Sequence, residues 1–273
     1  MKAIANFIKR YPQAVFWAIA YGVFFGGYVL YMLFPSDLWQ YLIWGVALGG
    51  LFVTAVADGR DGVKVFFSRI VRWRVGVQWY AVALLLPLVL RLGAYGLNIL
   101  FGAQPTASLQ LPPWPEFITS FLFIFFTVAL GEEPGFRGFA LPRLLIGRTA
   151  IAASLILGIL HAIWHLPLFL FAGDPPIQTI LIVISGSIIF TWMFNHTRGS
   201  VLLAMLLHAS VDLWTPIFNP LFSGADAMRQ SIWLTALYVL TAILIAILAG
   251  RELGRKPEIS AQPLSQEQQL AAD

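Results

Sequence analysis

The sequence predicts an all-α protein, a polytopic bundle of about eight transmembrane helices, and three observations lead to this fold class. Hydrophobic residues make up 59% of the 273 residues and charged residues only 11%, whereas a soluble domain carries about 25% charged residues. Apolar runs long enough to span a bilayer recur along the chain. Lysine and arginine residues flank these runs rather than forming a patch interleaved with aromatic residues, so nothing indicates binding to nucleic acid.

The first half of the chain contains four of the predicted spans. Gly45, Gly49 and Gly50 lie in the second of them and would let another helix approach closely. Arg91 lies inside the third, where it must reach the interface or pair within the bundle. The polar segment after the second span is either a solvated loop or an amphipathic helix at the membrane surface. The four spans are residues 14–34, 38–57, 75–101 and a run that begins near 117.

The second half contributes four more spans, at residues 149–171, 177–194, 200–218 and 231–248. Residues 136–148 carry three arginines beside large apolar residues and are expected to form an amphipathic connection at the membrane surface. Residues 1–250 are therefore interpreted as a single transmembrane domain, with its motif-bearing core at 117–218. Residues 251–273 are rich in Pro, Gln and Ser, which is typical of a disordered tail.

The distribution of basic residues predicts the orientation of the chain. With eight spans, every Lys and Arg except Arg91 and Arg229 falls on one side, which the positive-inside rule makes cytoplasmic. Both the N- and C-termini are then cytoplasmic. The first span has no clear cleavage site for a signal peptide, so it is expected to stay in the protein. We expect an integral protein of the bacterial inner membrane, with its site toward the cytoplasmic side.

The stretch 131–138, Gly-Glu-Glu-Pro-Gly-Phe-Arg-Gly, follows the apolar run that ends at residue 130. An acidic residue at the centre of a membrane helix costs about 2.5–3.5 kcal/mol, so two adjacent carboxylates there predict a functional site. Glu133 and Arg137 are four residues apart, share a helix face and can pair. Glu132 lies about 100° around the helix and is free for chemistry. Pro134 and Gly135 would break the helix there, which is tolerated where backbone lines a cavity.

Two of the four histidines, His165 and His208, complement a lone Glu132, and each lies inside a later apolar run. His165 stands near the end of the fifth span. His208 stands in the seventh span, one helical turn before Asp212, so the two side chains face the same way.

Taken together, these three motifs resemble the CPBP family, whose members are the CAAX prenyl endopeptidases and the bacteriocin-processing (Abi) membrane proteases. The resemblance extends over about residues 117–212 and rests on Glu-Glu-x-x-x-Arg, on a helix-terminal histidine, and on His-x-x-x-Asp. Two positions depart from the family pattern. His161 stands where the family usually has a bulky apolar residue, and Asp212 stands where the eukaryotic enzymes usually have Asn.

The resemblance implies an intramembrane endopeptidase that acts on a membrane-associated peptide or a lipidated protein. In this reading, Glu132 with His165 activates a water, His208 donates to the oxyanion, and Asp212 orients His208. Glu133 and Arg137 hold the motif in shape. Such hydrolysis needs a base and oxyanion donors, and a desolvated glutamate is a stronger base. The expected partners are membrane lipid and the substrate, and no cofactor is favoured.

Other functions also fit the residues. His165, His208 and Glu132 would suffice for a catalytic zinc with an open fourth position. His161 and His165 have the spacing of a zincin pair, but Ala162 stands where such a motif has glutamate, so His161 is interpreted as a packed helix residue. A non-catalytic immunity or scaffold protein would keep the motifs for structure. A transporter could use them as a proton relay, although no inverted repeat is apparent.

Overall fold

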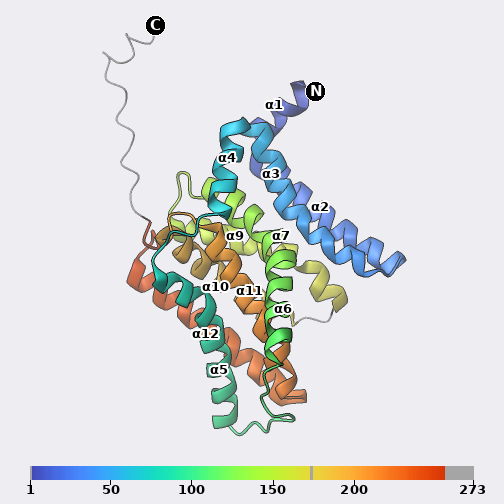
Figure 1. Cartoon of the computed structure of the whole chain (residues 1–273), viewed down its shortest axis with the longest axis vertical. Helices are drawn as coiled ribbons and strands as arrows, with labels where there is room; N and C mark the ends of the chain where they lie inside the picture. Colours follow the sequence, from blue (N-terminus) through green and yellow to red (C-terminus); the bar gives the residue numbers. More distant parts are fainter. Residues whose placement is uncertain (1, 173–174, 256–273) are drawn as a thin grey trace.

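The structure is a computed structural model and describes residues 2–172 and 175–255, which contain helices and no strand (Figure 1). This confirms the predicted all-α class. The α-helices are α1 (Lys2–Arg10), α2 (Pro12–Leu33), α3 (Gly45–Ala57), α4 (Gly59–Ile70), α5 (Val77–Leu100), α6 (Trp114–Ile124), α7 (Leu130–Glu133), α8 (Leu141–Leu144), α9 (Ala150–Trp164), α10 (Pro176–His196), α11 (Val201–Phe218) and α12 (Gly224–Ala249). Short π-helical segments are η2 (Phe125–Ala129), η3 (Pro134–Ala140) and η4 (Leu168–Ala172), and 3₁₀ segments are η1 (Asp37–Trp44) and η5 (Asn219–Leu221).

Seven helical segments in the described ranges are long and apolar enough to cross a membrane, and a shorter apolar helix at Tyr41–Ala57 matches the second predicted span. The prediction of about eight spans is therefore confirmed. The segment containing the acidic pair, Trp114–Leu144, is the longest at 31 residues. The seven segments are Pro12–Leu33, Val77–Leu100, Trp114–Leu144, Ala150–Phe171, Pro176–His196, Val201–Leu221 and Gly224–Ala249. The orientation of the termini stays a prediction.

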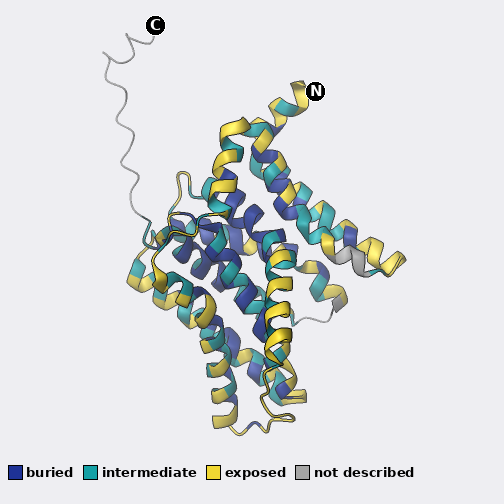
Figure 2. Ribbon diagram, viewed as in Figure 1, coloured by how far each residue is buried: buried dark blue, intermediate teal, exposed yellow. Residues whose placement is uncertain are grey.

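The helices form two packed groups around the acidic segment. In the first group, α5, α10, α11 and α12 pack on one another, and α9 packs against α10. In the second, α2 and α3 form a hairpin that leans away from the bundle, and α3 lies against α7 and η3 (Figure 1). Buried residues gather where the groups meet, whereas α6 and the far end of the hairpin are largely exposed (Figure 2).

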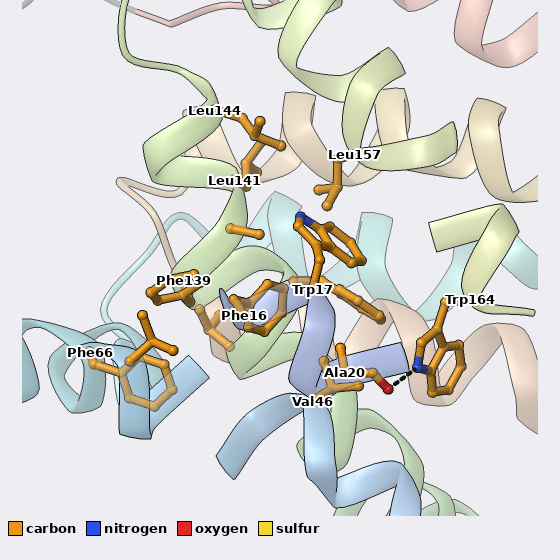
Figure 3. Packing of buried hydrophobic residues seen from close by; sticks show 14 of the residues in the cluster. Phe16, Trp17, Ala20, Val46, Phe66, Phe139, Leu141, Leu144, Leu157 and Trp164 are labelled. Carbon is orange, nitrogen blue, oxygen red and sulfur yellow. Dashed lines mark hydrogen bonds between the residues drawn. The ribbon is translucent and has the colours of Figure 1, made fainter. Parts of the chain in front are cut away.

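A cluster of aromatic side chains joins the hairpin to the acidic segment and to α9. Trp17 stacks on Phe136 with ring centroids 5.6 Å apart, and Phe16 lies 4.8 Å from Phe139. Trp164 Nε1 donates a hydrogen bond to the carbonyl oxygen of Ala20 at 3.2 Å (Figure 3). The cluster fixes one face of α9 through Trp164, and this positions His161, one turn earlier, and His165, directly after the helix.

The prediction that residues 136–148 form a connection at the membrane surface is wrong for the first half of this segment, because residues 131–141 are all buried. Phe136, Phe139 and Leu141 are fully inaccessible and pack among α2, α3 and α9. The chain continues inward as a π-helix after the Glu-Glu pair and does not turn onto the membrane surface. The arginines had indicated a surface, but Arg137 is 2% exposed and is neutralised inside the protein by Glu133.

The polar segment after the second span forms the helix α4, which agrees with the predicted amphipathic helix and not with a solvated loop. Phe66 of α4 is buried, whereas the Lys64–Asp61 pair on the opposite side is exposed. Arg69 donates to the carbonyl oxygen of Gly138 at 2.9 Å. This helix therefore packs against the acidic segment and is not a solvated loop.

The predicted tail begins at residue 251, and residues 251–255 pack on the body. Leu253 is fully buried, and Arg255 donates to the backbone of Leu145 and Arg148 at 2.8 and 2.9 Å. Residues 256–273 lie outside the described residues.

The predicted close approach at the glycines of the second span is confirmed, because a Cβ added to Gly50 would lie 3.1 Å from Gly135 Cα in the acidic segment. The same contact gives a first prediction. A Cβ added to Gly135 would lie 2.4 Å from the carbonyl oxygen of Val46, which is rigid helix backbone. Gly135→Ala is therefore expected to destabilise the protein by about 1–3 kcal/mol through overpacking. Gly22→Ala is the matched control, because nothing lies within 4 Å of its added Cβ. Thermal melting in detergent measures both, and equal melting temperatures for Gly135→Ala and wild type would contradict this account.

Candidate active site

The acidic pair lies on α7, a single helical turn between the π-helical segments η2 and η3. A π-turn widens a helix and is frequent at functional sites. Glu132 is 3% exposed and Glu133 is fully buried. Two carboxylates are thus held side by side in the protein interior, where each needs partners of its own.

Glu133 is the centre of a buried hydrogen-bonded group. Its Oε1 accepts from Arg137 Nη1 at 2.9 Å, as the sequence predicted, and also from His208 Nδ1 at 2.7 Å. Arg137 in turn lies over the ring of Phe190 on α10, with the guanidinium carbon 4.3 Å from the ring centroid. Glu133 therefore ties α7, η3 and α11 together, which extends the supporting role expected of it.

Glu132 points to a different neighbour. Its Oε2 lies 3.3 Å from His161 Nε2 on α9, without the alignment of a hydrogen bond. Neither His161 nitrogen nor Glu132 Oε2 has a hydrogen-bond partner among the described residues. These atoms are buried, so they are chemically competent to bind a group that enters the site.

His165 stands one helical turn beyond His161, with the two ring centroids 4.7 Å apart. Its Nδ1 donates to the carbonyl oxygen of His161 at 3.0 Å. A neutral ring that donates at Nδ1 carries its lone pair on Nε2, so His165 is set up to accept a proton or a hydrogen bond there.

His208 contacts a carboxylate at each ring nitrogen. Nδ1 faces Glu133, and Nε2 lies 3.4 Å from Asp212 Oδ2, one turn along α11. Because a carboxylate only accepts, His208 can donate at both nitrogens as the imidazolium. The Asp212 side chain is 38% exposed, so this end of the group is the more open one.

A cavity of about 1130 Å³ collects all of these side chains. Its remaining lining is mostly apolar and comes chiefly from α2, α5, α6, η4, α10, α11 and the first half of α12. The structure therefore brings together every residue that the sequence placed in the site, and it adds His161. The cavity residues that belong to the motifs are Glu132, Glu133, Arg137, His161, His165, His208 and Asp212.

The zinc alternative can be compared with these positions. Among the described residues, no group of three or more His, Asp or Glu side chains is arranged to hold a metal ion. Both nitrogens of His208 face carboxylates, which leaves only His165 Nε2 and Glu132 of the three suggested ligands free. As placed, the three residues do not form a ligand set. The choice between glutamate and zinc chemistry stays a prediction.

His161 is the residue whose position the sequence analysis underrated. It is packed as expected, with its ring centroid 4.2 Å from that of Phe136, but it also faces Glu132 in the cavity. Two signals in the sequence pointed toward it. It lies one helical turn before His165, and it stands where the CPBP family usually has a bulky apolar residue.

Comparison with known proteins agrees with the motifs. Residues 114–214 match the family model described as type II CAAX prenyl endopeptidase, Rce1-like. A curated relative, CAAX prenyl protease 2 from Methanococcus maripaludis, is 30% identical over 146 residues, which cover 48% of this chain and 53% of the relative. This chain thus spans about half the length of the relative it matches. The family match includes every motif residue of the cavity, and the resemblance found in the sequence is confirmed.

Proposed function

Because residues 114–214 match the CAAX prenyl endopeptidase family, we propose that this chain is an intramembrane endopeptidase that uses Glu132 to activate water. The observation that carries the proposal is the position of Glu132. It is 3% exposed, its Oε2 has no hydrogen-bond partner among the described residues, and it lines a cavity with His161 and His165. A carboxylate in such a setting has little competition from solvent and is a stronger base than an exposed one.

The proposed first step forms a tetrahedral intermediate. Glu132 takes a proton from a water while the water oxygen attacks the peptide carbonyl carbon. His165 accepts a hydrogen bond from the same water at Nε2, which orients its lone pair. His161 Nε2 lies 3.3 Å from Glu132 Oε2, so the same water can also reach His161. General base catalysis by a positioned group of this kind contributes about 10²–10⁴-fold in rate.

The second step breaks the C–N bond. The intermediate carries its negative charge on the former carbonyl oxygen. His208 donates to that oxygen from Nε2, and this N–H is shared between the oxyanion and Asp212, which lies 3.4 Å away. Asp212 orients the imidazole, and Glu133 fixes its other nitrogen at 2.7 Å. As the bond breaks, the proton held by Glu132 passes to the departing amine, so the carboxylate is regenerated. The products are one peptide with a new carboxylate and one with a new amine.

The cavity supports a membrane-associated substrate. Its volume of about 1130 Å³ exceeds the roughly 300–1,000 Å³ of ordinary small-molecule sites. Apolar side chains of α2 and η4, such as Phe24, Tyr28 and Phe171, line it away from the acidic pair. A peptide that carries a lipid chain fits this combination of polar centre and apolar surround. We accordingly propose a lipidated or membrane-bound peptide as substrate and a position in the bacterial inner membrane, with the site toward the cytoplasm.

The test is cleavage of peptides by the purified protein in detergent, with matched peptides that carry or lack a lipid chain. We expect cleavage of the lipidated form, unchanged by a chelator. His161→Ala and His165→Ala are each expected to lose activity at least about tenfold, whereas His196→Ala, an exposed histidine outside the cavity, keeps it. Loss of activity with chelator and its rescue by zinc would overturn the glutamate mechanism. No cleavage by a folded wild-type protein would favour the non-catalytic scaffold.

A further inference from the structure

Three arginines meet where the connection between α4 and α5 passes the turn between α10 and α11. Arg72 Nη1 donates to the carbonyl oxygen of Arg198, and Arg198 Nη2 donates to the carbonyl oxygen of Arg74. The guanidinium carbon of Arg74 lies 5.1 Å from the ring centroid of Trp73. These three arginines, here called the arginine cluster, thus belong to two connections that are far apart in the sequence and in direct contact in the fold.

No carboxylate balances the arginine cluster within the part of the chain that the structure describes. The ion pairs of described lysines and arginines all involve other basic residues, so no described Asp or Glu oxygen lies within 4.0 Å of these three guanidinium groups. A guanidinium has five donors, and the backbone carbonyl oxygens take one from Arg72 and one from Arg198. Like charges held close together repel one another, so an anion that enters the cluster would stabilise it.

The backbone of Arg198 is unusual for an arginine. Its φ is 56°, in the left-handed region, and the following Gly199 N donates to the carbonyl oxygen of Phe194 at 2.8 Å, as at the end of a helix in a Schellman motif. Glycine is the usual residue at this position, because a Cβ is unfavourable there. The chain therefore places a guanidinium at this point despite a backbone cost, which favours a functional role for its charge.

The arginine cluster lies at the ends of three helices of membrane length. α5 begins at Val77, α10 ends at His196 and α11 begins at Val201, and each belongs to a segment long enough to cross a membrane. Val71 and Trp73, beside the arginines in the sequence, are both exposed. Exposed apolar and aromatic side chains next to arginines are typical of the membrane boundary, where the phosphates of lipid headgroups lie.

We propose that the arginine cluster binds the headgroup phosphate of an anionic phospholipid. Guanidinium groups bind phosphate with two parallel hydrogen bonds, and basic clusters next to membrane helices recognise anionic headgroups. Phosphatidylglycerol carries a net negative charge and zwitterionic phosphatidylcholine does not, so the cluster should distinguish between them. This inference does not depend on the proposed peptidase function, and it gives the expected contact with membrane lipid a defined site.

A lipid bound at the cluster would act on the helix that carries His208. Ser200 Oγ donates to the carbonyl oxygen of Arg72 at 2.7 Å and accepts from Leu203 N at 3.3 Å, as the N-cap of α11. A phosphate held by Arg72 and Arg198 therefore fixes the start of α11. Because such a ligand binds only the folded protein, the melting temperature should rise with the concentration of anionic lipid.

The test measures thermal melting of the full chain in detergent micelles that contain phosphatidylglycerol or phosphatidylcholine with the same acyl chains. The melting temperature of wild type should rise with phosphatidylglycerol to a plateau, and phosphatidylcholine should give a smaller rise. Native mass spectrometry of the same samples should retain bound phosphatidylglycerol. Inorganic phosphate at matched concentration should have no effect, and a rise equal to that with the lipid would overturn the assignment to a phospholipid.

Two variants test the cluster at little risk to the fold. In Arg74→Gln, whose guanidinium makes no hydrogen bond with a described residue, the phosphatidylglycerol concentration at half of the melting shift should rise at least about tenfold, as loss of a charged hydrogen bond gives. Arg198→Gly removes a second guanidinium, and glycine suits the left-handed backbone there. This variant should show the same weakening and still fold in phosphatidylcholine.

Arg60→Gln is the matched control, because it removes the same charge from an exposed position near the start of α4, about 18 Å along the helix from its end. This variant should need the wild-type concentration of phosphatidylglycerol. Equal weakening in Arg60→Gln and Arg74→Gln would mean that the overall charge attracts the lipid, and it would overturn the site. Equal melting shifts of wild type with the two lipids would overturn the inference without any variant.

Discussion

Glu132→Gln is expected to lower peptide cleavage by about 10²–10⁴-fold, the range for loss of a general base. Glutamine keeps the size of the side chain but cannot take a proton from water. Among the described residues, Glu132 makes no ion pair with a basic residue other than its contact with His161, so the fold should tolerate the change. The measurement is kcat/KM for a lipidated peptide, together with the melting temperature of the same preparation.

Glu116→Gln provides the control for this variant. Glu116 lies on the same membrane-length segment but is exposed and outside the cavity. The Glu116→Gln variant should cleave the peptide at the wild-type rate. The expected loss leaves at most about a hundredth of the wild-type activity. If Glu132→Gln retained more than about a tenth, Glu132 would not be the base.

Arg137→Met is expected to have the largest effect on stability, about 3–5 kcal/mol, because it removes the guanidinium from the buried carboxylate of Glu133. Glu133 is fully buried, and its ion-pair partners among the described residues are Arg137 and His208. Methionine approximates the length of the lost side chain, so the change in the free energy of unfolding reports mainly the loss of the charge and less the loss of packing. Reversible unfolding in mixed detergent gives the free energy of unfolding.

Lys64→Met is the matched control, since Lys64 pairs with Asp61 on the exposed side of α4. An exposed pair contributes at most about 1 kcal/mol. The double variant Glu133→Gln/Arg137→Met removes both buried charges and should recover part of the loss. If the single Arg137 variant unfolded like wild type, the buried group would not hold the site together.

Much of the fold could be predicted because hydrophobic length is a local property of the sequence. The apolar runs at residues 14–34, 75–101 and 177–194 each correspond to a helix of membrane length. The pairing of Glu133 with Arg137 also followed from helix spacing alone, since four residues make about one turn. These features depend on near neighbours in the chain.

Burial of charge could not be predicted in the same way. Arg137 was interpreted as a surface residue, yet it is buried. Glu133, the carboxylate that neutralises it, is held in the interior by a further contact with His208 of α11, about 70 residues later. The contact of Glu132 with His161 likewise depends on how α7 and α9 pack. Such contacts are set by tertiary structure, and the sequence contains only the residue types that make them possible.

The burial of residues 131–141 also accounts for the depth of His165. Counted from the start of the fifth span, His165 lies nearly 25 Å along the helix, which is far from an acidic pair placed at the end of a span. The segment with the pair does not end there and continues for about a dozen residues to Leu144, or about 18 Å. Both groups thus lie within the interior at comparable depth.

Because this segment is so long, the position of the acidic pair should depend on the thickness of the membrane. Its 31 residues extend about 45 Å, whereas the hydrocarbon layer is about 30 Å thick. Its first half is exposed at Ile118, Leu122 and Phe126 and would face lipid in a bilayer, whereas residues 131–141 are enclosed by protein. That lipid-facing half is about 25 Å long, so it is the part that a bilayer must match. Lipids with longer or shorter acyl chains would shift the height of the carboxylates relative to a substrate anchored in the same bilayer.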